Sequence, residues 1–183
     1  MGVTVGVTTI HYDEVMKLIA QLKLQPTPDQ AEALRQTLEQ ANAACNRISA
    51  TAWQTQTFRQ FPLHRLCYAD TRAAFGLSAQ LTVRCIAKVA DAYKLDRKRE
   101  RSFSPTGSLA YDDRILSWNL PQRTISIWTI AGRQTIPFVC GDRQWQLLHT
   151  RHGESGLAYV NEQFYLLATC DVETPTMEDI HDL

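Results

Sequence analysis

The chain has 183 residues, with 44% hydrophobic and 21% charged residues, and its 19 Lys and Arg balance 19 Asp and Glu to a formal net charge of zero. This composition is that of a folded globular protein rather than a disordered chain, and neutrality taken alone argues against a nucleic-acid binder. No apolar run approaches the ~20 residues that cross a bilayer, which excludes a membrane span.

The five cysteines are scattered and include no CxxC pair. An odd number of dispersed cysteines predicts free thiols in a reducing, cytosolic setting and gives little support to a zinc site. The charge, in contrast, is unevenly distributed. Residues 171–183 carry five acidic side chains and no Lys or Arg, so residues 1–170 hold 19 basic and 14 acidic side chains. The chain is therefore basic over most of its length and acidic at its end.

A first strand is predicted over Lys17–Leu24, because polarity nearly alternates there. Leu18, Ala20, Leu22 and Leu24 fall on one face, which is the period-two pattern of a half-buried strand. A single strand needs ladder partners for its backbone, and no second strand signal appears until about residue 108.

The stretch "TPDQ" predicts the start of a long helix. Thr27 and Gln30 have the spacing of a capping box, Pro28 suits the first helical position, and Asp29 favours the positive end of the helix dipole. The helix is expected to run to about Phe58. Its apolar seam recurs at spacings of three and four, at Leu34, Leu38, Ala41, Cys45, Ile48 and Ala52.

Two further helices follow. A short one ends near Gly76, and Ser78 is the expected cap of another that runs to about Leu95. The apolar face of the last helix is formed by Leu81, Cys85, Val89 and Ala92, with Ile86 and Tyr93 flanking it.

From Ser102 onward helical spacing gives way to six short β-rich runs separated by turn signals, with a short helix predicted in "CGDRQWQLLHT". Short strands with tight turns indicate a small, closed or nearly closed barrel. We therefore expect an α+β fold: a small split β-barrel whose first strand pairs with the second half of the chain, with a helical insertion between its first and second strands.

No catalytic constellation is evident. His149 and His152, with Glu154 nearby, have a spacing conceivable for a metal, but exposed polar residues at a helix end are the favoured interpretation. We expect no catalytic residue, no metal ligand and no cofactor in this chain.

The segment 84–101 carries seven basic and three acidic residues. Such a cluster suits phosphate binding, and it equally suits a solvated helix end. Aromatic residues on the strands, such as Trp118 and Trp128, suit base stacking or, more often, a barrel core.

The order of these motifs carries a family resemblance. A strand, "PT-x-x-Q", a long helix with "NAACN", a Gln-led basic helix ending "AYK", then "SFSPTGSLAYDDRILSW" and "ATCDVETP" resemble the N-terminal half of the TnpB-type RNA-guided DNA endonucleases encoded by bacterial transposons, relatives of the type V CRISPR effectors. The resemblance covers about Met16 to Pro175.

The resemblance implies a division of the chain. Residues 1–15 are an extension, 16–25 the first strand of a wedge barrel, 26–98 a helical recognition lobe, 99–175 the rest of the wedge barrel, and 176–183 an acidic tail that leads to a RuvC nuclease domain missing from this chain. Mg²⁺ is expected only in that missing domain. The implied partners are a guide RNA and a target DNA with its adjacent motif, with no membrane, in the bacterial cytoplasm at the nucleoid; the oligomeric state stays open.

The resemblance also suggests site residues. Gln80, Ser108 and Tyr111 are expected near target-adjacent DNA, and the amides of Asn42 and Asn46 are expected either on a nucleic-acid backbone or capping neighbouring helices. Two alternatives stay open: a catalytically dead RNA-guided regulator of DNA, and a protein-interaction module. The full set of expected RNA- and DNA-binding residues is Lys17, Lys23, Asn42, Asn46, His64, Gln80, Arg84, Lys88, Lys94, Arg97, Lys98, Arg99, Arg101, Ser108 and Tyr111.

Overall fold

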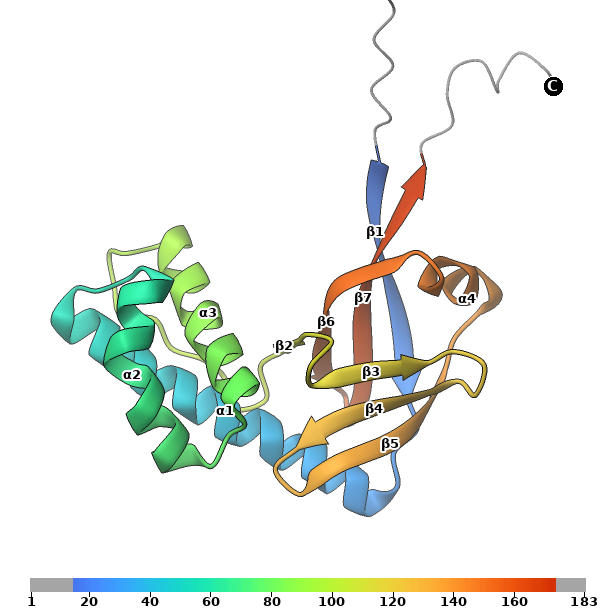
Figure 1. Cartoon of the computed structure of the whole chain (residues 1–183), viewed down its shortest axis with the longest axis horizontal. Helices are drawn as coiled ribbons and strands as arrows, with labels where there is room; N and C mark the ends of the chain where they lie inside the picture. Colours follow the sequence, from blue (N-terminus) through green and yellow to red (C-terminus); the bar gives the residue numbers. More distant parts are fainter. Residues whose placement is uncertain (1–14, 174–183) are drawn as a thin grey trace, which may run out of the picture.

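The computed structural model describes residues 15–173, in which four helices accompany a seven-stranded antiparallel sheet (Figure 1). This confirms the α+β class. The strands are β1 (Val15–Leu24), β2 (Leu109–Tyr111), β3 (Leu116–Asn119), β4 (Thr124–Thr129), β5 (Gly132–Val139), β6 (Arg151–Val160) and β7 (Gln163–Glu173). The helices are α1 (Pro28–Thr55), α2 (Gln60–Phe75), α3 (Ala79–Leu95) and α4 (Asp142–Leu148).

The sheet has the order β2-β6-β7-β1-β5-β4-β3. Strand β1 pairs with β7 from Val15↔Glu173 to Lys23↔Tyr165, and with β5 at Lys23↔Val139 and Leu24↔Phe138. The first strand therefore takes its partners from the second half of the chain, as its sequence pattern requires. The sheet is barrel-like and nearly closed. It stays open between its two edge strands, β2 and β3, which are consecutive in the chain but do not pair.

The strands alternate between buried and exposed side chains, which places one apolar face inside the sheet. In β4, for example, Ile125 and Ile127 are buried while Ser126 between them is only half-buried. The inward side chains of the other strands include Ala20, Leu22, Leu24, Ile136, Phe138, Leu157, Phe164, Leu166, Ala168 and Cys170.

Helix α1 connects the sheet to the other helices. The predicted capping box is present: Gln30 N–H donates to Thr27 Oγ1 at 3.2 Å, and Thr27 N–H donates to Gln30 Oε1 at 3.1 Å. Near this end Thr37 Oγ1 accepts a bond from Ile130 N–H at 3.1 Å, which holds the helix against the β4–β5 turn. With 28 residues α1 is roughly 42 Å long, and its far half packs against α2 and α3 (Figure 1).

The helices pack closely because their facing residues are small. Every residue of the predicted α1 seam is buried. Where α1 meets α3, Cys45 Sγ lies 3.8 Å from Cys85 O and Cys85 Sγ lies 3.6 Å from Ala41 O. Helices α1–α3 follow β1 in chain order; their interpretation as an insertion into a barrel, and the division into wedge and recognition lobe, stay predictions.

Strand β6 is longer than the run 157–160 that predicts it in the sequence. It begins at Arg151, because a register shift between Arg151 and Ser155 lets a polar stretch join the ladder with β7 before the apolar run. Residues 1–14 of the expected extension and the whole expected acidic tail lie outside the described residues. Within residues 15–173, no helix combines the length and apolar character that a membrane crossing requires.

Candidate nucleic-acid interface

One side of α1 carries a polar stripe formed by Asn42, Asn46 and Ser49, spaced so that all three face the same way. The segment 101–107 runs along this stripe and includes a turn in which Gly107 N–H donates to Ser104 O at 3.0 Å. Asn46 forms two bonds to Phe103, donating from Nδ2 to the carbonyl at 3.1 Å and accepting from the backbone N–H at 2.8 Å. Ser49 Oγ donates to Arg101 O at 2.5 Å. The stripe thus satisfies the backbone of a loop, a role that neither of the two expectations for the asparagines anticipated.

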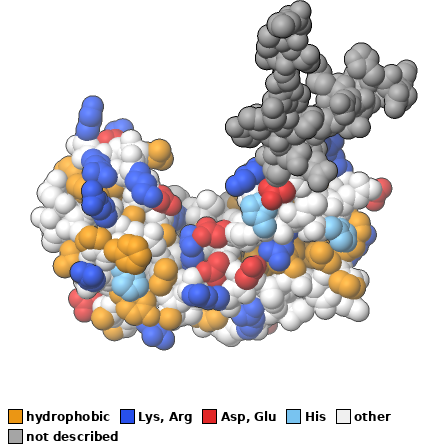
Figure 2. Space-filling view, turned by 45° about the horizontal axis from the view of Figure 1, so that its top comes forward, with side chains coloured by type: hydrophobic (Ala, Val, Ile, Leu, Met, Phe, Trp, Pro, Cys, Tyr) orange, Lys and Arg blue, Asp and Glu red, His pale blue; other side chains and the backbone are white. Residues whose placement is uncertain are grey.

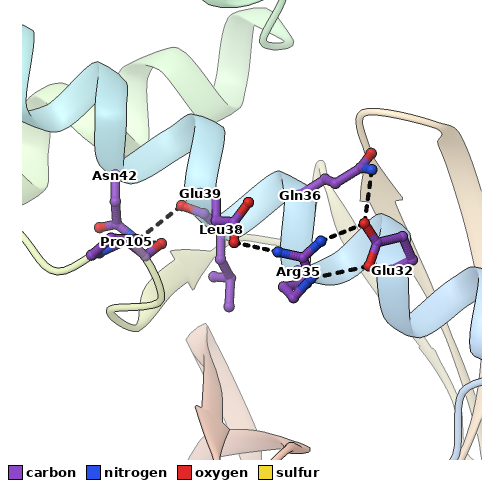
Figure 3. A network of polar contacts seen from close by, with 7 residues as sticks. All are labelled: Glu32, Arg35, Gln36, Leu38, Glu39, Asn42 and Pro105. Atoms are coloured by element: carbon purple, nitrogen blue, oxygen red, sulfur yellow. Dashed lines mark hydrogen bonds and ion pairs between the residues drawn. The ribbon is translucent and has the colours of Figure 1, made fainter.

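Asn42 is fully buried in this arrangement. Its Nδ2 lies 3.1 Å from Pro105 O (Figure 3) and 3.0 Å from Gly107 O, while its Oδ1 accepts from Lys88 Nζ at 2.7 Å. Lys88 Nζ also donates to Ser108 O at 2.7 Å and lies 5.2 Å above the Phe103 ring. Burial lowers the pKa of Lys88. Asn42 and Lys88 therefore already have partners in the loop, and a contact of either side chain with nucleic acid stays a prediction.

Tyr111 is also fully buried. Its hydroxyl donates to Trp128 O at 3.1 Å, and burial raises the pKa of the phenol. The Tyr111 ring has no exposed surface on which a base could stack, and its role in binding stays a prediction. Ser108, in contrast, is exposed.

Much of the basic segment 84–101 is neutralised by nearby acids. Lys94 pairs with Asp91 at 3.2 Å, and Asp96 pairs with both Arg99 at 3.2 Å and Arg101 at 3.4 Å. The backbone N–H of Lys98 and the Arg99 guanidinium lower the pKa of Asp96. These pairs follow from i, i+3 and i, i+5 spacing, so the acids already visible in the segment remove much of its positive charge.

Three more ion pairs compensate two other guanidinium groups. Arg84, on α3, pairs with Glu154 on β6 and is only 18% exposed at its side chain, so it joins the helices to the sheet. On α1, Arg35 lies between Glu32 and Glu39 (Figure 3). The positive charge of each of these two arginines is thus compensated by carboxylates of the protein.

Other exposed cations of the helical part have no carboxylate within ion-pair distance among residues 15–173. Lysine and arginine side chains outnumber acidic ones on the face of the helical part in Figure 2. Arg65 and Arg72, seven residues apart on α2, were missed at the level of sequence although their spacing places them on one helix face. These exposed cations, named here the free cations, are Arg47, Arg59, Arg65, Arg72, Arg97 and Lys98.

Between the helical part and the sheet the surface carries both signs of charge (Figure 2). Gln80, at the start of α3, donates from Nε2 to Asp112 Oδ2 and accepts from Arg114 Nη1 at 2.9 Å. The neighbouring Asp113 pairs with Arg151 at 3.2 Å. Gln80 is thus held against the β2–β3 connection by groups that are themselves at the surface.

The remaining expected residues are dispersed. Lys17 and Lys23 are exposed on β1, while His64 lies on α2 with its ring stacked on Tyr68, centroids 4.6 Å apart. The structure does not bring the lysines together with the helical cations into one patch.

No protein-family model matches the chain, and no curated protein matches its sequence. Within the described residues, no three His, Cys, Asp or Glu side chains form a group that could hold a metal ion. Function is therefore inferred from the geometry and charges above and from the order of the motifs.

Proposed function

We propose that this chain is the guide-RNA- and target-DNA-binding portion of a TnpB-like RNA-guided DNA endonuclease. The proposal gives the described residues a role in binding and none in cleavage. It is supported by the order of the sequence motifs and by the way the helices leave several cations available beside a small barrel-like sheet, an architecture common among nucleic-acid binders.

The free cations are the observation that carries the proposal. A protein binds nucleic acid largely by neutralising phosphates and releasing their counterions. Lysines and arginines already paired with carboxylates contribute little to this, since their charge is compensated within the protein. Arg65, Arg72 and Lys98 remain uncompensated by described residues on the helical part.

The finer assignment is part of the proposal. The sheet is the wedge, α1–α3 form the recognition lobe inserted between β1 and β2, and the surface around Gln80 faces the DNA next to the target. Protein recognition of shape and of a short adjacent motif, with base pairing supplying the rest, is the logic of guided effectors.

The first test is to isolate the protein from its native host and sequence any RNA that co-purifies. With that RNA, the triple variant Arg65→Gln, Arg72→Gln, Lys98→Gln should bind more weakly. Its slope of log affinity against log salt should flatten by roughly 0.7 for each phosphate that the variant no longer neutralises.

The matched control is Arg35→Gln, whose guanidinium is already compensated by Glu32 and Glu39. It should leave the slope unchanged. An unaltered slope in the triple variant, or absence of a reproducible RNA, counts against the proposal.

A second candidate, a protein-interaction module, is favoured by one observation. Phe61 and Leu66, both on α2, are 84% and 48% exposed, and exposed apolar side chains are groups that a protein partner can bury. Purified protein that shifts no RNA but forms a stable complex with another protein, abolished by Phe61→Ser, would establish this candidate instead.

A further inference from the structure

A cleft of about 250 Å³ opens where three segments of the helical part meet: the end of α1, the start of α2 and the chain that follows α3. The sequence did not predict this cleft. Among the residues that line it, only Arg97 also belongs to the residues expected to bind nucleic acid. The cleft is lined by Gln56, Thr57, Phe58, Arg59, Pro62 and Arg97.

Two of the free cations line this cleft. Arg59 and Arg97 are exposed and come from different segments, and no acidic residue lines the cleft. Asp96, next to Arg97 in the chain, pairs with Arg99 and Arg101 instead. Guanidinium groups that lack a carboxylate partner suit the planar, bidentate recognition of a phosphate.

The cleft also offers a flat surface. The Phe58 ring is fixed by Tyr93, with centroids 4.7 Å apart, and by Trp53 at 6.5 Å. The Arg97 guanidinium carbon lies 5.6 Å from the Phe58 centroid, and Arg97 Nε donates to Tyr93 O at 3.3 Å. A ring and a guanidinium held in this way form a surface on which a base can stack.

Polar groups complete the lining. Gln56 adopts the left-handed conformation, with φ 52°, as it ends α1, and its Nε2 donates to Trp53 O at 2.7 Å. This bond fixes the amide and leaves its Oε1 as an acceptor. Thr57 Oγ1 donates to Thr55 O at 3.3 Å and likewise keeps its acceptor capacity. Both groups suit a base N–H or a ribose hydroxyl.

We propose that this cleft binds one nucleotide unit, with its base against Phe58 and Arg97 and its phosphate between Arg59 and Arg97. The inference rests on the proposed function in taking the nucleotide as part of a bound strand. A free nucleoside monophosphate offers the same chemistry, and the experiment distinguishes the two sources.

The first arm uses the full chain and two single strands of about eight nucleotides, a site size typical of such proteins. One strand is oligothymidylate and the other is the same phosphate backbone without bases. Wild-type protein should bind the thymidylate strand roughly tenfold more tightly than the abasic strand, because one base stacks in the cleft.

The decisive comparison is between two variants that each remove two charges. In Arg59→Gln, Arg97→Gln the preference for the base-bearing strand should fall to about one. In Arg65→Gln, Arg72→Gln both strands should bind more weakly while the preference persists. Thermal unfolding of both variants verifies that they fold.

A wild-type preference near one, or an equal loss of preference in both variants, overturns the inference while leaving strand binding and the proposed function standing. A preference that disappears only in the cleft variant supports it.

The second arm applies if the protein binds neither single strand. That outcome overturns the proposed function but leaves open whether the cleft binds a free nucleotide. Thymidine monophosphate and inorganic phosphate are then titrated while the NMR signal of the Trp53 indole is followed. A shift with the nucleotide, absent with phosphate and absent in the cleft variant, supports a free-nucleotide site. No shift, or an equal shift with phosphate, overturns the inference.

Discussion

The helical part contains two groups of polar residues that look alike in the sequence and differ in the structure. The first is the α1 stripe of Asn42, Asn46 and Ser49, with Lys88, whose donors and acceptors are used by the segment 101–108. The second is the pair Arg59 and Arg97 at the cleft, which no described carboxylate compensates. A polar side chain is therefore available for a ligand to the extent that its hydrogen-bonding groups and its charge are not already used within the protein. Arg97 uses only its Nε, which donates to Tyr93 O, and no described carboxylate compensates its charge.

The largest loss of stability is expected for Asn42→Ala. The change removes the bonds to Pro105 and Gly107 and leaves the Lys88 ammonium one acceptor short in a half-buried position, so we expect a loss of about 3 kcal/mol in the free energy of unfolding. Urea titration measures it.

The graded control is Asn46→Ala, whose side chain is exposed and forms two bonds, with an expected loss of about 1 kcal/mol. Equal losses for the two variants would contradict the account of the stripe. Nucleic-acid affinity of the folded protein should change for neither.

Tyr111→Phe tests the corresponding buried polar group of the sheet. Losing the bond to Trp128 O should cost about 1.5 kcal/mol at neutral pH. Because the folded pKa is raised above the unfolded value of 10.0, the unfolded wild-type chain ionises first, and its stability falls as the pH rises above that value.

The variant lacks this ionisation, so the stability gap between wild type and Tyr111→Phe should narrow above pH 10.0. Denaturant titrations at a series of pH values measure the gap. A gap that stays constant would show that the phenol reaches solvent in the folded state.

Helix ends extend the comparison. Thr27→Ala removes the capping box of α1 and should cost about 1 kcal/mol. Arg59 stands at the equivalent position of α2 and forms no side-chain cap bond, so Arg59→Gln should cost less than about 0.5 kcal/mol. Thermal unfolding of the two variants compares them, and a larger loss for Arg59→Gln would assign that side chain a structural role instead.

The smallest effect is expected for Arg99→Gln. Its side chain is 80% exposed and paired with Asp96, so the change should alter stability by less than about 0.5 kcal/mol. It should also flatten the salt dependence of nucleic-acid binding less than Lys98→Gln does. Identical slopes for the two variants would show that pairing with Asp96 does not withhold Arg99 from phosphates.

Local signals predicted most of the fold. The Thr27–Gln30 box, the Ser78 cap, the α1 seam and the period-two alternation of β1 each have a cause within a few residues, and each is present. The start of β6 was not predicted. The polar residues before Ser155 join the ladder through a register shift against β7, and the sequence of β6 alone contains no signal for such a shift.

The candidate site was much less predictable. Asn42 and Lys88 have the sequence character of surface residues, and only the path of 101–108 shows that they are enclosed. The acids that compensate Arg84 and Arg151 lie far away in the chain, at Glu154 and Asp113, so the remaining free charge cannot be obtained by counting along a segment. Arg65 and Arg72 had a usable signal in their spacing, which an emphasis on the densest basic run overlooked.

The pairing of β1 with β7 has a mechanical consequence. Val15 and Glu173 face each other as paired neighbours at the tip of a two-stranded ribbon that projects from the rest of the sheet (Figure 1). Tension applied between these two residues breaks the β1–β7 backbone hydrogen bonds one after another from the tip, instead of loading all of them at once. The ribbon should therefore separate at low force, while the helices, which carry none of the load, keep their packing until β1 has peeled back toward α1.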